Sequence, residues 1–156
     1  MTEYRRYWLL GGTYFFTVNL AERRRDLLVR HIDVLREVVR QVKARHPFQL
    51  DAVVVLPEHL HCVITLPHDD DDFAIRLGAI KANFSRRIPC GEPRSTSRVS
   101  KRERGVWQRR YWEHAIRDEG DFRRHIDYLH FNPVKHGLVM RVSDWPYSSF
   151  HRYVRN

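Results

Sequence analysis

The sequence predicts an α+β fold on the ferredoxin-like, or RRM-like, βαββαβ plan: an antiparallel sheet with helices on one face and a further helix after the last strand. Two observations support this prediction. Segments rich in β-branched and aromatic residues alternate with segments of helical periodicity, in the order strand, helix, strand, strand, helix, strand, helix. The 156 residues, 42% of them hydrophobic, suit one folded domain, and no repeat divides them, so we expect a single domain over residues 1–156.

Each element has a local signature. The predicted helices show apolar residues at spacings of three and four, and the run HDDDDF offers N-caps for the second of them. Pro57-Glu58 joins two strands as a hairpin, which we expect at the centre of the sheet. The predicted strands cover residues 13–20, 48–57, 59–67 and 106–117, and the predicted helices cover residues 22–45, 73–88 and 118–132.

Three segments are expected to be irregular. Residues 89–105 are rich in Pro, Gly, Ser and Arg without periodicity, which predicts a flexible basic loop. Asn132-Pro133 is expected to end or break the last helix, because a proline disfavours helical geometry in the residue before it. Residues 140–156 form a short tail that we expect to pack through Trp145 and Phe150.

The charge of the chain is high and uneven. Lys and Arg number 28 against 19 Asp and Glu, which gives a net charge of +9 and a pI near 10.1. Between residues 86 and 110 there are nine basic residues and two acidic ones. Such a patch indicates a polyanionic partner, most often nucleic acid. The alternative is a solvated loop whose charge only aids solubility.

Other classes fit poorly. No apolar run approaches the roughly 20 residues that span a bilayer, and the N-terminus lacks the pattern of a signal peptide. The two cysteines make neither a disulfide framework nor a CxxC zinc site, which suits a reducing cytosol. We therefore expect a cytoplasmic protein with no membrane segment.

The stretch LPEHLHCVITLP places two histidines at the start of a predicted strand. Residues at i and i+2 of a strand share a face, so His59 and His61 point one way while Leu60 and Cys62 point the other. Two imidazoles on one face form a natural pair of ligands for a divalent ion. The alternative is two structural histidines, since the chain contains ten.

The last predicted helix has a stripe of chemically capable groups beside its apolar stripe. His125, Tyr128 and Asn132 are spaced three and four residues apart and so lie along one side. Tyr128 is a candidate nucleophile and Asn132 a candidate third, oxygen ligand, with His125 as the second candidate for that position. The alternative is a tyrosine at the edge of the core and an asparagine that ends a helix.

These residues stand in motifs that resemble a known family. PEHLHC contains the HUH signature of two histidines around a large apolar residue. RRYWEHAIRDEGDFRRHIDYLHFNPVKHGLV, followed by SDWPYSSF, resembles the REP-associated tyrosine transposases, single-tyrosine relatives of insertion-sequence transposases that act on single-stranded DNA. The similarity covers nearly the whole chain. The resemblance implies that His59, His61 and Asn132 bind Mg²⁺ or Mn²⁺ and that Tyr128 is the nucleophile.

The resemblance also implies an activity and a partner. Tyr128 would form a covalent 5′-phosphotyrosine link and release a 3′-OH, and another 3′-OH could reverse the step and join strands without ATP. The expected partners are DNA hairpins of repetitive extragenic palindromes (REP), bound by a bacterial, nucleoid-associated monomer or weak dimer. The predicted phosphate contacts are Arg5, Arg6, Arg86, Arg87, Arg109, Arg110 and Lys135. They are interleaved with aromatic residues that could stack on unpaired bases, namely Tyr7, Trp8, Trp107, Tyr111 and Trp112.

Three other functions were weighed. A non-catalytic DNA- or RNA-hairpin-binding protein would keep the basic patch without needing the His, Tyr and Asn set. A rolling-circle replication initiator shares the two histidines, but the stretches NPVKHGLV and SDWP argue against it. A small zinc hydrolase would want an acidic general base and would leave the basic patch unexplained.

Overall fold

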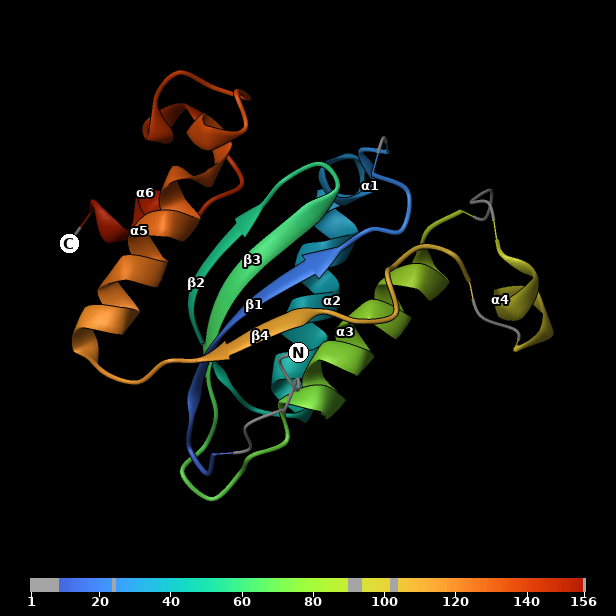
Figure 1. The fold of residues 1–156 in the computed structure, drawn as a ribbon, viewed down its shortest axis with the longest axis horizontal. Helices are drawn as coiled ribbons and strands as arrows, with labels where there is room; N and C mark the ends of the chain where they lie inside the picture. The colour runs from blue at the N-terminus through green and yellow to red at the C-terminus, as the bar shows by residue number, and fades with distance from the viewer. Residues whose placement is uncertain (1–8, 24, 90–93, 102–103, 156) are drawn as a thin grey trace, which may run out of the picture.

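A computed structural model describes residues 9–23, 25–89, 94–101 and 104–155. Its centre is a four-stranded antiparallel sheet in the order β2-β3-β1-β4 (Figure 1). The strands are β1 (Thr13–Asn19), β2 (Gln49–Val55), β3 (His59–Thr65) and β4 (Trp112–Ala115). The predicted α+β class and antiparallel sheet are confirmed. The hairpin is not central as a pair, because β3 is an inner strand beside β1 while β2 is an edge strand.

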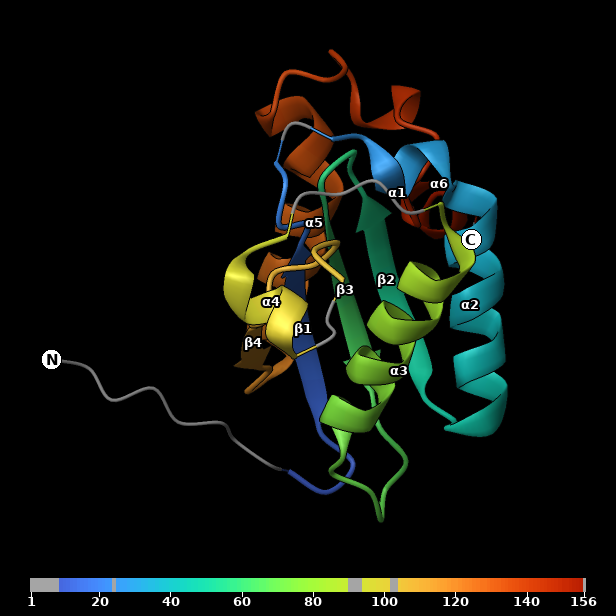
Figure 2. The ribbon, with the colours of Figure 1, turned by 90° about the vertical axis from the view of Figure 1, so that its right-hand side faces the viewer.

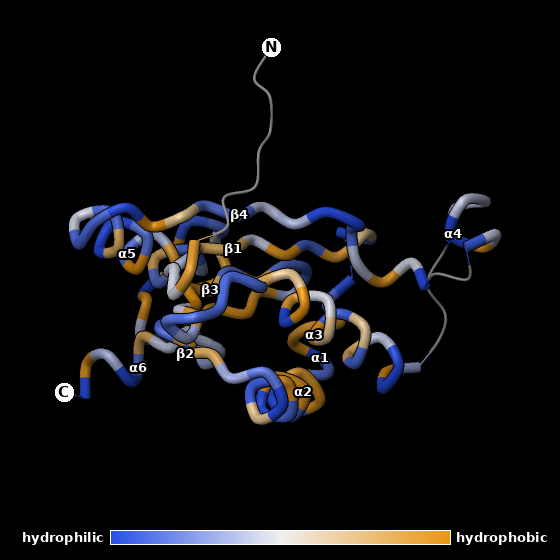
Figure 3. Tube along the Cα trace, turned by 90° about the horizontal axis from the view of Figure 1, so that it is seen from below, coloured by the Kyte–Doolittle hydropathy of each residue, from blue (hydrophilic) through white to orange (hydrophobic). Residues whose placement is uncertain are grey.

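The helices lie on both faces of the sheet. Figure 2 shows α3 (Phe73–Arg87) in front of the sheet, α2 (Ile32–Arg45) beside it at the right and α5 (Glu119–Lys135) behind it. The edge-on view in Figure 3 shows α2 and α3 below the strands, with α5 apart from them. The shorter helices are α1 (Leu27–Arg30), α4 (Thr96–Ser100), the 3-10 turn η1 (Val142–Asp144) and α6 (Phe150–Tyr153).

Side-chain alternation along the central strands separates two cores. Tyr14 and Phe16 of β1 belong to the core under α2 and α3. Phe15 and Val63 belong to the core under α5, together with Leu129 of that helix. On β3, Leu60 and Cys62 lie in the first core, so His59 and His61 face α5. The predicted shared face of the two imidazoles is therefore confirmed.

Three predicted boundaries were wrong. The helix predicted over 22–45 starts at Leu27 and divides into α1 and α2 at His31, whose φ of −111° and ψ of 37° are not helical. The strand predicted over 106–117 pairs regularly only from Trp112 to Ala115, with an isolated bridge between Leu20 and Trp107 before it. The loop predicted over 89–105 contains the short helix α4, capped by the Ser95 side chain.

The predicted break at Pro133 was also wrong, because α5 continues to Lys135. A proline removes one amide donor, but the amides after it can still bond. His136 N donates to Asn132 O, and Leu138 N donates to Pro133 O. The chain leaves the helix at Gly137, whose φ of +72° favours glycine. Residues up to 135 therefore share one rigid helix with Tyr128.

The tail docks along the outer edge of β2. Val55 N donates to Tyr147 O, and Ser149 N donates to Val53 O. The buried indole of Trp145 donates to Val55 O at 2.9 Å. These bonds cover a strand edge that would otherwise be open to other chains. The predicted packing of the tail through Trp145 is confirmed, and the Phe150 ring lies 5.8 Å from that of His130.

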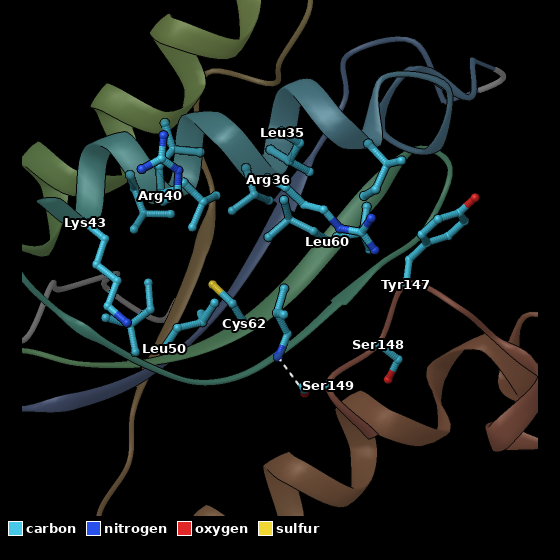
Figure 4. A pocket seen from close by; sticks show the side chains of 18 of the residues that line it. Leu35, Arg36, Arg40, Lys43, Leu50, Leu60, Cys62, Tyr147, Ser148 and Ser149 are labelled. Atoms are coloured by element: carbon cyan, nitrogen blue, oxygen red, sulfur yellow. Dashed lines mark hydrogen bonds between the residues drawn. The ribbon is translucent and has the colours of Figure 1, made fainter. Parts of the chain in front are cut away.

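A cavity of about 440 Å³ lies between α2 and the sheet (Figure 4). Its walls include Leu35, Leu50, Leu60 and the free thiol of Cys62. Burial raises the pKa of this thiol to about 12, so Cys62 is a small apolar core residue. Because Leu60 and Cys62 alternate with the two histidines, the cavity opens on the opposite face of the sheet from them. Among the described residues, no helix has the length and apolarity needed to cross a bilayer.

Candidate active site

The two imidazoles on β3 are buried and held by neighbours through Nδ1. His59 Nδ1 lies 2.7 Å from a carboxylate oxygen of Glu58, which also accepts from Arg23 Nε at 3.0 Å. His61 Nδ1 lies 2.8 Å from the hydroxyl of Thr17, its partner on β1. The rings meet edge to face at 4.9 Å. Each histidine is thus anchored through one nitrogen, which leaves Nε2 as the candidate ligand atom.

The environment keeps both histidines neutral. Burial, followed by the neighbouring His59, lowers the pKa of His61 to about 3, although the Asn132 side chain works in the opposite direction. Burial also lowers the pKa of His59, against the raising effect of Glu58. Near pH 7 both rings are therefore unprotonated, with lone pairs free to bind a cation.

Asn132 completes a set of polar atoms that lack partners. Its side chain is fully buried, and neither its Oδ1 nor its Nδ2 has a hydrogen-bond partner within the described structure. His61 Nε2 is buried and unpartnered as well. Leaving such groups unpaired costs about 1–3 kcal/mol each. Two imidazole nitrogens and one amide oxygen are a suitable donor set for a divalent ion such as Mn²⁺, so these residues fit a metal site.

Tyr128 lies on α5 against this pair. Its ring centroid is 5.6 Å from that of His61 and 6.0 Å from that of Phe15. Unlike the histidines it is 40% exposed, so a substrate can reach its hydroxyl. Lys135 donates from Nζ to this hydroxyl at 3.3 Å, and the same ammonium lies 4.9 Å from the ring centroid. Tyr128 therefore lies beside His61, on which the Asn132 side chain also acts.

His125, the second candidate for the third ligand, belongs to another cluster. Asp121 accepts from the imidazole of His114 at 2.9 Å and lies 3.1 Å from Nδ1 of His125. Three potential metal ligands thus converge, but His125 Nδ1 also lies 2.8 Å from the carbonyl oxygen of Asp121. That nitrogen must donate a hydrogen there and has no lone pair for a metal. We interpret the cluster as a hydrogen-bonded link between β4 and α5.

The Asp121 carboxylate is the anion of that link. Burial works to raise its pKa, but the amide of Arg117 and the imidazoles of His114 and His125 outweigh burial and hold the pKa at about 2. The carboxylate also accepts a hydrogen bond from the backbone amide of Arg117 at 2.9 Å, just before the helix begins. Asp121 is therefore ionised at any ordinary pH and fixes the start of the helix that bears Tyr128.

Sequence reasoning missed His136. Its ring lies 5.2 Å from that of His59, at the end of α5. A signal was present, because His136 follows Asn132 by four residues and extends the stripe of His125, Tyr128 and Asn132. The helix break expected at Pro133 concealed it. The outer partners Glu58 and Thr17 were missed too, although strand register alone sets Thr17 opposite His61.

The predicted phosphate contacts divide by position. Arg5 and Arg6 lie outside the described residues, as do Tyr7 and Trp8. Arg86 and Arg87 are in the last turn of α3. Arg109 donates to Ser97 Oγ at 2.9 Å, which places it beside α4. Among the members of this set that the structure describes, Lys135 is the one that lies at Tyr128.

Part of the basic run serves the fold. Arg98 donates to the carbonyls of Arg104 and Trp107, and Arg104 donates to those of Ser85 and Ile88. Trp107 is buried and donates from its indole to Lys81 O, so it is a core residue, whereas Trp112 is exposed. The basic run is nevertheless connected to the candidate active site through Leu20. Leu20 forms an isolated β-bridge with Trp107, and its amide donates to the carbonyl oxygen of Glu58, the residue before His59. In Figure 1 the basic segment around α4 extends from the sheet away from α5.

Known proteins match the sequence of this chain. The model of the family Transposase IS200 like matches residues 12–130. A REP-associated tyrosine transposase of Escherichia coli K12 is 51% identical over 99% of this chain and 86% of its own length. A putative REP-associated tyrosine transposase of Haemophilus influenzae is 45% identical over 99% of this chain and 89% of its own length.

A solved structure agrees with these relatives. The structure of a REP-associated tyrosine transposase bound to a REP hairpin superposes with a TM-score of 0.85 at 49% identity, covering 100% of this chain and 87% of that one. Sequence and fold thus point to the same group over the full length of the chain. The chain therefore belongs to the IS200-like transposase family, among the REP-associated tyrosine transposases, and is a transposase-type enzyme.

Proposed function

We propose that this enzyme cleaves and rejoins single-stranded DNA beside REP-type hairpins, with Tyr128 as nucleophile and a divalent metal at His59, His61 and Asn132. The observation that supports the proposal best is the placement of an exposed phenol against buried donor atoms that lack partners. The hairpin as partner follows from the E. coli relative and from the related structure, which is bound to a REP hairpin.

The chain supplies positioning and charge. β3 fixes the two imidazoles, and α5 fixes Tyr128 and Asn132 one turn apart on the facing side. His59, His61 and Asn132 would hold a Mg²⁺ or Mn²⁺ ion, which when bound would polarise a phosphate oxygen for in-line attack. Glu58 and Thr17 hold the imidazole rings through Nδ1, which leaves each Nε2 available as a ligand. The exposed position of Tyr128 leaves room for a strand to lie along α5.

The reaction exchanges one phosphodiester bond for another. Tyr128 Oη forms a bond to phosphorus while the bond to the 3′-oxygen breaks. The phenol proton passes to solvent, and the departing 3′-oxygen takes up a proton as the 3′-OH. The phosphotyrosine retains the phosphodiester energy, so a second 3′-OH can displace the tyrosine and join strands. Because each chain offers one such tyrosine, two ends need two subunits or two successive events.

We assign the DNA backbone to the basic surface between α3 and β4. The proposed phosphate contacts there are Arg86, Arg87, Arg109 and Arg110, with Lys135 at the site itself. The exposed Trp112 is a candidate for stacking on an unpaired base. Such contacts give affinity that falls steeply with salt.

The test is covalent capture. The protein is mixed with 3′-labelled hairpin DNA that has single-stranded flanks, with Mg²⁺ or Mn²⁺, and run on a denaturing gel. We expect a protein–DNA band that requires metal and disappears in Tyr128→Phe. Tight binding without such a band, across several flanks and both metals, would instead indicate a non-catalytic hairpin-binding protein.

A further inference from the structure

We infer that Lys135 is a catalytic residue, whose ammonium binds a non-bridging oxygen of the scissile phosphate beside the Tyr128 hydroxyl. This inference rests on the proposed function. It goes beyond a general backbone contact, because it assigns Lys135 to one phosphate and to the reacting state.

The geometry singles out this lysine. Within the described structure, Lys135 is the hydrogen-bond partner of the Tyr128 hydroxyl, with Nζ 3.3 Å from Oη and 4.9 Å from the ring centroid. In the attack, Oη bonds to phosphorus, so the non-bridging oxygens come within hydrogen-bond reach of a donor already beside Oη. A lysine ammonium has three donors, so it can keep its bond to Oη and add one to the phosphate.

The helix explains why the lysine can be there. Lys135 follows Tyr128 by about two turns of α5, and long helical side chains point back toward the N-terminus. This requires the helix to pass through Pro133. Had α5 ended at Asn132, nothing would fix Lys135 over the tyrosine ring. The continuation of the helix therefore puts Asn132, Tyr128 and Lys135 on one rigid body.

The Tyr128 ring also contacts the candidate metal site. Its ring meets the His61 ring edge to face at 5.6 Å and the Phe15 ring at 6.0 Å. Neutral His61 and Asn132 are the candidate metal ligands there, so the reacting phosphate would be within reach of both a bound cation and the ammonium. In this arrangement Lys135 acts as a hydrogen-bond donor and not as a base. It donates hydrogen bonds to the developing charge on phosphate and takes no proton from Tyr128.

The first experiment measures single-turnover formation of the covalent adduct at saturating hairpin DNA. We expect Lys135→Met to slow this step about 100-fold, as for loss of one donor to a reacting oxyanion. Lys135→Arg keeps a charged donor and should be faster than Lys135→Met. Lys43→Met is the matched control on α2, across the sheet, and should react at the wild-type rate. Lys135 is exposed, so unfolding midpoints should not change.

The second experiment identifies the phosphate. In a Tyr128→Phe background, which keeps the ring but cannot cleave, affinity is measured for DNA with the cleavage-site phosphate intact or replaced by a neutral methylphosphonate. We expect Lys135→Met to weaken binding of the intact DNA only. An equal loss on both DNAs, or an unchanged single-turnover rate in Lys135→Met, would overturn the inference. If the wild-type protein forms the covalent adduct, these two results would overturn only the role of Lys135 and not the proposed function. The proposed function fails if the wild-type protein forms no adduct.

Discussion

The hydroxyl of Thr17 on β1 lies 2.8 Å from Nδ1 of His61 on β3, directly across the strand pair. Glu58 engages Nδ1 of His59 in the same way. Each imidazole is thus held in place by a neighbouring side chain before any ligand binds. Outer partners of this kind orient ligands and raise metal affinity.

Thr17→Val removes the hydroxyl and keeps the shape of the side chain. We expect Mn²⁺ to bind about 10-fold more weakly, because the His61 ring is less firmly oriented. Calorimetric titration with Mn²⁺ alone measures this without DNA. Thr13→Val is the control, since Thr13 lies on the same strand and face but bonds Thr65 instead. Equal affinities in wild type and both variants would show that the hydroxyl has no part in the site.

Asn132→Leu should have opposite effects on binding and on stability. Without metal, wild-type Asn132 buries an amide whose atoms have no hydrogen-bond partner among the described residues, so leucine should raise the unfolding midpoint in EDTA or leave it unchanged. With metal, loss of the oxygen ligand should weaken Mn²⁺ binding and cancel most of the stabilisation that Mn²⁺ gives wild type. Thermal unfolding with and without Mn²⁺ measures both effects. A variant that is destabilised in EDTA and still binds Mn²⁺ normally would remove Asn132 from the ligand set.

Strand alternation explains why the fold and the histidine pair were predictable. Along β3, Leu60 and Cys62 alternate with His59 and His61. This period of two determines which side chains share a face of the sheet, whatever the tertiary packing around them. Pro133 shows the limit, since a local rule predicted a break while the buried helix retained its other hydrogen bonds. The error also hid His136 and the position of Lys135. The structural use of Arg98 and Arg104 was not predictable either, because their carbonyl partners meet only in the folded chain.

Acid should destabilise the metal-free protein through His61. Its pKa is lowered from 6.5 to about 3 on folding, so between these values the unfolded chain binds a proton at residue 61 that the folded chain does not. The free energy of unfolding therefore falls as the pH is lowered through this window. Denaturant unfolding in EDTA from pH 7 to pH 4 should show a steeper decline for wild type than for His61→Gln. Parallel curves for the two proteins would contradict the shifted pKa.

Phosphate contacts should appear in the salt dependence of DNA binding. Arg86→Met and Arg110→Met each remove one proposed contact, so each should make the slope of log Kd against log salt shallower by about 1. Arg30→Met is the control, because Arg30 pairs with Asp26 on α1. Fluorescence anisotropy of a labelled hairpin, at salt concentrations from about 50 mM to about 300 mM, measures the slopes. Slopes identical to wild type would place the DNA backbone elsewhere on the protein.

The most direct test of the central claim is to identify the residue that becomes linked to DNA. The covalent adduct is digested with nuclease and trypsin, and the peptides are sequenced by mass spectrometry. The account predicts that the tryptic peptide of residues 125–135 gains the mass of a 5′-linked nucleotide on Tyr128 and that no modified peptide forms without metal. A nucleotide on any other residue, or no modified peptide from DNA that is cleaved, would contradict Tyr128 as the nucleophile.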